Sequence, residues 1–128
     1  MNYLLDTHTF LWFIDNDKSL SATAKAFIEA PDSAIFLSVA SLWEIAIKVS
    51  LEKLDLPTPL TSFLNQQLKE NSIEPLPIEV EHIGKIATLP FHHRDPFDRL
   101  IIAQSLSENW PIIGRDGIFD AYAVNRYW

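Results

Sequence analysis

The sequence predicts an α/β fold in which a small parallel β-sheet is flanked by helices. The main observation is that short apolar segments alternate with longer segments of helical periodicity along the chain, which is typical of βαβ units. No internal repeat or low-complexity segment interrupts this alternation. Because the chain has 128 residues and only short loops, we expect a single domain over residues 1–128.

The expected strands are short and rich in apolar or β-branched residues. They cover residues 2–5, 34–39, 73–78, 111–114 and 123–128. Prolines interrupt the third of these segments, so we expect only a short extended piece there. The last segment is expected at an edge of the sheet.

The expected helices have the apolar spacing of a helix that packs on a sheet, and several carry start or stop signals. Ser21 is a typical N-cap for the second helix, and Pro31 ends it. Pro96 is favoured in the first turn of the last helix. The expected helices cover residues 7–14, 21–30, 40–53, 60–71, 80–89 and 96–109.

The composition restricts the classes of function. The formal net charge of −7 argues against a protein that binds nucleic acid mainly by neutralising phosphates, so such binding would need a metal ion or a local basic patch. The chain has no cysteine, so any metal would be held by oxygen or imidazole ligands. The first residues contain neither a basic leader nor a long apolar run, so we expect a cytoplasmic protein without a membrane span.

Four acidic residues lie where they could meet at one edge of the sheet. Asp6 follows the first expected strand, Glu44 lies in the helix after the second, and Asp116 follows the fourth. Asp98 lies in the first turn of the last helix. Ligand sites of open parallel sheets lie at this edge, outside the carboxyl ends of the strands. Carboxylates that cluster there repel one another and need a counter-charge, for which Mg²⁺ or Mn²⁺ is the usual choice with oxygen ligands.

Each of these acids also has a structural interpretation that involves no function. Asp6 could cap the helix that follows it. Glu44 could pair with Lys48, four residues later, on a solvated helix face that includes Ser41. Asp116 precedes a glycine and could be a turn residue. The local sequence leaves these alternatives open.

The segment "HHRDPFDRLIIAQS" contains two acids with different expected roles. Asp95 precedes Pro96 and is expected to be the N-cap of the helix, which is a mainly structural role. Asp98 then occupies the third helical position, where an acid can reach back to the cap, stabilise the helix dipole or face a metal.

The histidines and tryptophans carry weaker signals. His92 and His93 could contact a phosphate or transfer a proton, but we interpret them as loop residues on the surface, and we assign no role to His8 or His82. The four tryptophans are expected in the core or at an interface, because no basic residues interleave with them as a stacking platform for bases would require.

Four segments of the chain together resemble a known family. They are "YLLDTHTFLWF", "SVASLWEIAIK", "HHRDPFDRLIIAQ" and "PIIGRDGIFDAY". In order and spacing they resemble the PIN-domain ribonucleases of the VapC type, which are the toxins of type II toxin–antitoxin systems. The resemblance spans nearly the whole chain. It implies a PIN-like fold, RNA as the substrate and a cognate antitoxin as a partner, and the tally of aromatic residues also favours a homodimer.

Residue by residue, the resemblance implies that Asp6, Glu44, Asp98 and Asp116 are the catalytic and metal-binding acids, with Mg²⁺ or Mn²⁺ as the cofactor. The metal would lower the pKa of a water molecule and supply hydroxide for in-line attack, which leaves 5′-phosphate and 3′-hydroxyl ends. Gly114 departs from the pattern of the family, because relatives often have Thr or Ser two residues before the fourth acid. This chain lacks that hydroxyl.

Two other interpretations belong to different classes. A PIN-like binding module without catalysis would be favoured by a missing carboxylate, whereas all four are present in this sequence. A phosphotransferase of the haloacid dehalogenase class also begins with a strand that ends in aspartate. It needs the pattern D-x-D-x-T, and His8 occupies the position of its second aspartate.

Overall fold

The computed structural model describes residues 1–128 and confirms the α/β fold. Its centre is a five-stranded sheet with the strand order β3-β2-β1-β4-β5, in which every pair of neighbours is parallel. The last strand lies at an edge, as expected. The strands are β1 (Asn2–Leu5), β2 (Ala34–Ser38), β3 (Ile73–Leu76), β4 (Ile112–Ile113) and β5 (Arg126–Tyr127).

The helices begin and end close to the residues that the sequence signals indicate. Ser21 caps α2, and its hydroxyl accepts a hydrogen bond from the Ala24 N–H at 3.0 Å. Pro96 is the first residue of α6. None of the helices combines the length and apolar character needed to cross a bilayer. The helices are α1 (Thr7–Ile14), α2 (Ala22–Glu29), α3 (Val39–Ser50), α4 (Leu60–Glu70), α5 (Val80–Thr88), α6 (Pro96–Glu108) and the short 3₁₀ helix η1 (Gly117–Ala121).

The boundary between β2 and α3 differs from the prediction. We expected the strand to continue through Val39, but this residue already belongs to the helix. The cause is Ser38, whose hydroxyl accepts a hydrogen bond from the Ala40 N–H at 3.0 Å and so caps α3 directly at the end of the strand. No loop separates the two elements, so α3 begins at the carboxyl edge of the sheet.

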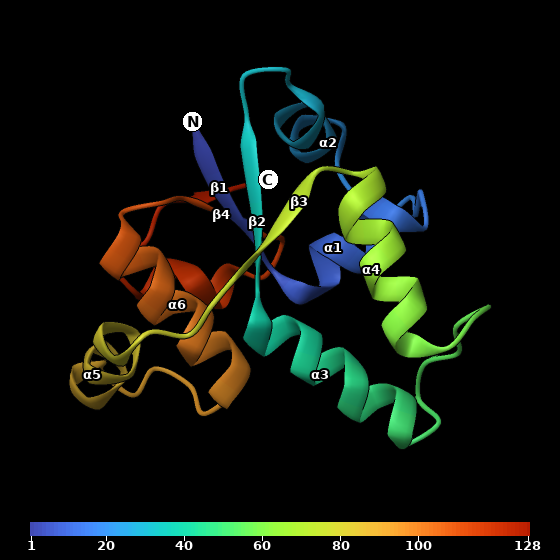
Figure 1. The fold of residues 1–128 in the computed structure, drawn as a ribbon. Helices are drawn as coiled ribbons and strands as arrows, with labels where there is room; N and C mark the ends of the chain where they lie inside the picture. The colour runs from blue at the N-terminus through green and yellow to red at the C-terminus, as the bar shows by residue number, and fades with distance from the viewer.

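Two apolar cores cover the two faces of the sheet. Leu5 packs with Phe10 and Ile45 in the larger core, and α1, α2, α3 and α4 all contribute to it. Leu4 packs with Ile101 of α6 in the second core. Neighbouring strand residues point to opposite faces, so β1 is buried on both sides. Figure 1 shows the sheet between α1, α2 and α4 on one side and α5 and α6 on the other.

The central strands end together at one edge of the sheet. Leu5, the last residue of β1, pairs with Leu37 of β2 and with Ile113 of β4. The Asp6 N–H extends this pairing by donating to the Ile113 carbonyl at 3.1 Å. Because α1 and α3 both begin at this edge, it gathers Asp6, the first turns of two helices and the loop after β4.

Candidate functional site

Asp6 lies between the end of β1 and the start of α1 and is only 5% exposed. It occupies the N-cap position of α1, as the capping interpretation expects, but no side-chain capping hydrogen bond forms, so capping does not explain why this acid is buried. Burial is the main reason why the pKa of Asp6 is raised to about 6, and the neighbouring backbone amide of Thr7 counteracts part of this effect. The negative charges of Glu44 and Asp116 raise the pKa of Asp6 further.

Glu44 reaches the same edge of the sheet from α3. The Thr7 hydroxyl donates to Glu44 Oε1 at 2.8 Å and also lies 2.8 Å from the Ser41 Oγ. Lys48 Nζ lies 3.6 Å from Glu44 Oε2, so the pair expected from the i, i+4 spacing is present. The solvated helix face expected to include Ser41 is absent, because Ser41 is fully buried. Thr7, the residue after Asp6, therefore holds the Glu44 carboxylate by a hydrogen bond. This role of Thr7 was not predicted from the sequence.

Asp95 and Asp98 lie in the same turn at the start of α6 but make different contacts. Asp95 is the N-cap, as predicted, and accepts hydrogen bonds from the N–H groups of Phe97 at 2.9 Å and Asp98 at 3.1 Å. The Asp98 carboxylate makes no bond to the cap, and its Oδ2 lies 3.3 Å from His93 Nε2. Burial raises the pKa of Asp98 to about 7, and the charges of Asp95 and Asp6 contribute to this rise.

A hydrogen-bonded chain holds His93 against Asp98. Arg99 Nη1 donates to the Tyr122 hydroxyl at 3.3 Å, and this hydroxyl lies 2.8 Å from His93 Nδ1. A tyrosine that accepts from arginine has its own proton to donate to Nδ1, which leaves the Nε2–H of His93 to donate to Asp98. His93 lies in the loop before α6, as expected, but it is only partly exposed and makes specific contacts that were not predicted. Its partner Tyr122 is 29 residues away along the chain, so no local pattern indicates this contact.

A pocket of about 330 Å³ opens beside Asp6. Asp116 lies in its wall, and the carboxylate accepts a hydrogen bond from the Ile118 N–H at 3.0 Å, which caps η1. The interpretation of Asp116 as a turn residue is thus correct, and the same side chain also faces the pocket. The residues that line the pocket are Asp6, His8, Trp12, Arg115 and Asp116.

Gly114 allows the loop after β4 to pack closely against Asp6. A Cβ atom at residue 114 would lie 3.2 Å from the Asp6 Cβ and 3.3 Å from the Phe119 Cε2. Both distances are shorter than ordinary van der Waals contacts between carbon atoms, and Phe119 is fully buried. A Ser or Thr side chain at this position would require one of these neighbours to move.

The four predicted acids have the donor chemistry of a magnesium or manganese site. All of them offer carboxylate oxygen, which these hard cations prefer. The charges of Glu44 and Asp116 act on Asp6, and the charge of Asp6 acts on Asp98, so the acids interact electrostatically. As the side chains stand, no three acidic or histidine residues are spaced to enclose a metal ion. The structure brings the four acids to one region without arranging them as a closed set of ligands.

The sequence belongs to a family with this fold. The model of the PIN domain family matches residues 3–125, and the chain belongs to the PIN domain family. Within it, the chain is similar to Ribonuclease VapC22 of Mycobacterium tuberculosis, with 31% identity over 114 residues that cover 88% of this chain and 85% of that protein. It is also similar to Ribonuclease VapC16 of the same organism, with 34% identity over 58 residues, or 45% and 41% of the two chains.

Solved structures of toxin–antitoxin proteins share the fold. A chain of VapBC2 from Rickettsia felis, bound to a promoter DNA fragment, gives a TM-score of 0.75 at 18% identity and covers 99% of this chain and 98% of its own. A chain of VapBC-5 from Mycobacterium tuberculosis gives a TM-score of 0.61 at 22% identity, with 98% and 95% covered. These matches confirm the predicted PIN-like fold and the resemblance to the VapC type.

Proposed function

We propose that this protein is an endoribonuclease that depends on Mg²⁺ or Mn²⁺ and is the toxin of a type II toxin–antitoxin system. The observation that carries the proposal is the pair of acids at the carboxyl edge of the sheet, the buried Asp6 and the partly buried Asp98, whose pKa values are raised to about 6 and about 7. Such a pair is costly to ionise without a cation. The membership in the PIN domain family and the similarity to Ribonuclease VapC22 support RNA as the substrate.

The residues that would hold the cation are Asp6, Glu44, Asp98 and Asp116. When bound, a divalent cation of this kind acidifies water and offsets the charge of a phosphodiester. Thr7 keeps the Glu44 carboxylate turned towards the edge of the sheet, and His93 does the same for Asp98. We assign to Thr7 and His93 a positioning role, because each holds an acid by a hydrogen bond from outside the acid's own helix.

The reaction that fits these residues is hydrolysis by water. No serine, cysteine or threonine nucleophile paired with a base is needed, because the acids can serve as ligands and one of them can orient the attacking water. In-line attack on the phosphorus then leaves a 5′-phosphate on one product and a 3′-hydroxyl on the other.

The direct test is to incubate the purified protein with RNA and Mg²⁺, with and without an excess of EDTA. We expect cleavage only with free Mg²⁺, and we expect the products to be degraded by an exonuclease that requires a 5′-phosphate. Cleavage that is undiminished in EDTA would disprove the metal dependence. A protein that binds RNA but never cleaves it would instead be the alternative, an inactive PIN-like binding module.

We propose a cognate antitoxin as a partner and the cytoplasm, where RNA is available, as the place of action. An arginine side chain of the antitoxin would suit the acidic pocket, because it can pair with the carboxylates and compete with the metal. The test is co-purification with the product of the neighbouring reading frame. A protein that is harmless when expressed alone and has no such partner would count against the toxin assignment.

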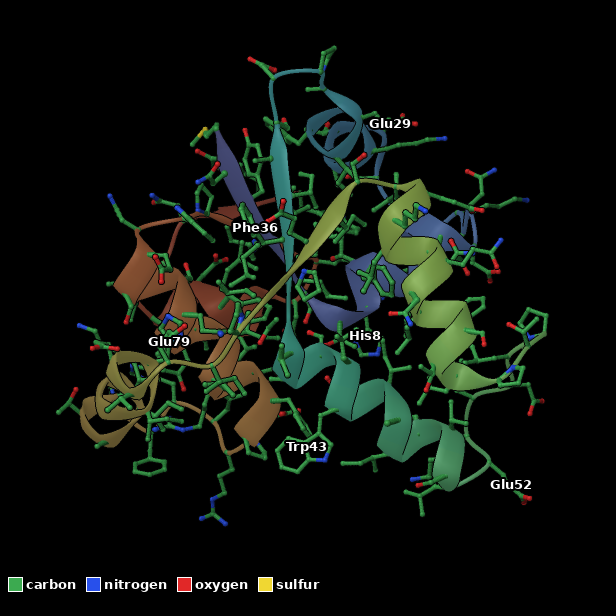
Figure 2. All side chains as sticks on the ribbon, in the orientation of Figure 1. His8, Glu29, Phe36, Trp43, Glu52 and Glu79 are labelled. Carbon is green, nitrogen blue, oxygen red and sulfur yellow. The ribbon has the colours of Figure 1, made fainter.

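A homodimer is the second proposed assembly. Trp43 is 60% exposed and Phe91 is 82% exposed, and both line a shallow, mainly apolar depression. Figure 2 shows Trp43 projecting from α3, and its ring packs edge-on against Phe97 of α6 at 5.1 Å. Exposed apolar surface of this kind marks interfaces. We expect the protein to elute as a dimer in size-exclusion chromatography, and a concentration-independent monomer would contradict this.

A further inference from the structure

Arg115 is a cation at the mouth of an acidic pocket that pairs with neither of the pocket's acids. The residue is exposed, and it lines the pocket together with Asp6 and Asp116. Its guanidinium takes part in none of the salt bridges of the chain. A surface arginine next to two carboxylates would ordinarily be expected to pair with one of them. Its donors are therefore available to a ligand.

Trp12 holds the guanidinium in place. Arg115 Cζ lies 4.7 Å from the centre of the Trp12 ring, which is the distance of a cation–π contact. The ring is fixed in turn by Trp128, which packs edge-on at 5.8 Å, and by His8, whose ring is tilted against it at 5.7 Å. This contact uses no N–H donor in a hydrogen bond, so the N–H groups of the guanidinium stay free for a ligand. Arg115 is thus oriented before any ligand arrives.

Two other basic residues next to the acids, Lys48 and Arg99, are already engaged. Lys48 pairs with Glu44 at 3.6 Å. Arg99 is buried and donates to the carbonyl groups of Leu89 and Pro90 at 3.3 and 2.9 Å. Since the whole chain carries a net charge of −7, an RNA strand that approaches the acids needs a cation at this point. Arg115 is the cation that the pocket itself supplies.

We propose that Arg115, held over the Trp12 ring, binds a backbone phosphate of single-stranded RNA next to the phosphate that is cleaved. This proposal rests on the proposed ribonuclease function and deepens it. The pocket of about 330 Å³ has the volume of a small ligand site. Asp6 and Asp116 line the same pocket, so a strand anchored at Arg115 passes directly beside two of the proposed metal ligands. Trp12 is a positioning residue in this arrangement.

The test measures binding of a short, fluorescein-labelled single-stranded RNA by anisotropy over a range of salt concentrations. Ca²⁺ replaces Mg²⁺, and a denaturing gel confirms that the strand stays intact. We expect Arg115→Gln to weaken binding about tenfold and to lower the slope of log K against log salt by about 0.7, the loss of one phosphate contact on a single strand. Lys69→Gln is the matched control, because Lys69 is an exposed cation on α4, away from the pocket.

A second pair of variants tests the role of Trp12. Trp12→Leu removes the ring face and should weaken binding severalfold while Arg115 keeps its charge, whereas Trp12→Phe keeps an aromatic face and should restore most of the affinity. A loss of packing alone would lower the melting temperature in both variants and leave the salt slope unchanged.

The failures of the two proposals can be distinguished. If the wild type cleaves RNA with Mg²⁺ but Arg115→Gln keeps the affinity and salt slope of the wild type, only the phosphate contact at Arg115 is wrong. An equal loss in Lys69→Gln would also overturn it, because binding would then reflect total charge. A variant that binds RNA normally but loses a co-expressed partner protein would place Arg115 in a protein interface. If the wild type neither binds nor cleaves RNA, both proposals are wrong.

Discussion

The helices α1 and α6 both begin after an aspartate, and these two aspartates differ in burial and in the hydrogen bonds of their side chains. Asp95, at the start of α6, is exposed and caps the helix with two hydrogen bonds to backbone N–H groups. Asp6, at the start of α1, is 5% exposed and makes no capping bond. Its pKa is raised to about 6, mainly by burial.

The difference arises from where each helix begins relative to the sheet. Asp6 directly follows β1, the central strand, so β2 and β4 and the elements after them enclose it. Asp95 follows a surface loop. The N-cap position predicts a structural role equally well for both residues. What distinguishes them is burial, because Asp6 is buried at the edge of the sheet and Asp95 is exposed. Asp98, one turn beyond Asp95, is closer to Asp6 in character because it is also partly buried with a raised pKa.

The largest expected effect separates the two aspartates by activity. Asp6→Asn should reduce Mg²⁺-dependent RNA cleavage by more than about a hundredfold, since even the outer partners of metal ligands are worth about ten- to a hundredfold. Asp95→Asn should keep most of the activity, because asparagine is as good an N-cap as aspartate. The measurement is the initial rate of cleavage at saturating Mg²⁺. Equal losses of cleavage activity in Asp6→Asn and Asp95→Asn would contradict the distinction between the two aspartates.

The pH dependence of stability should distinguish the same two residues without any metal. The pKa of Asp6 rises from 3.8 to about 6 on folding, so the folded chain binds this proton more tightly than the unfolded chain. The stabilising contribution is complete below about pH 4 and is lost as the pH rises through about 6, which amounts to roughly 3 kcal/mol. Urea unfolding in EDTA should show this fall for the wild type and a flatter profile for Asp6→Asn, with Asp95→Asn as the control.

The smallest expected effect concerns stability at the start of α6. Asp95→Ala should lower the free energy of unfolding by about 1 kcal/mol, because the N–H groups of Phe97 and Asp98 lose their acceptor. Cleavage should remain, since Asp98 keeps its contact with His93. Thermal unfolding and cleavage are measured on the same sample. A variant that is fully stable but inactive would show that Asp95, and not Asp98, faces the metal.

The fold could be predicted from the sequence because its elements are signalled locally. The apolar segment before Asp6 is a strand, Ser21 and Asp95 cap helices with their side chains, and Pro96 opens α6. Such signals depend on hydrogen bonds between residues two or three apart, which the sequence displays directly. The error at the end of β2 has the same origin, because Ser38 is compatible with both a strand end and a helix cap.

The support of the site could not be predicted, because it joins segments that are distant in the chain. Thr7 reaches Glu44 over 37 residues, and His93 reaches Tyr122 over 29. Arg115 stacks on Trp12 although the sequence shows no interleaving of basic and aromatic residues. That the four acids lie near one another could be predicted from their places after strands and from the family pattern, whereas their partners depend on which helix faces which loop.

The measurement that tests the metal site most directly is the melting temperature of the wild type, Asp98→Asn and Asp95→Asn, each with and without millimolar Mn²⁺. A ligand that binds only the folded state stabilises it by about 2.7 kcal/mol at a hundred times its Kd. We therefore expect a clear increase in melting temperature for the wild type and for Asp95→Asn, and little or none for Asp98→Asn. An unmoved wild type, or an equal increase in Asp98→Asn, would contradict the assignment of these acids as metal ligands.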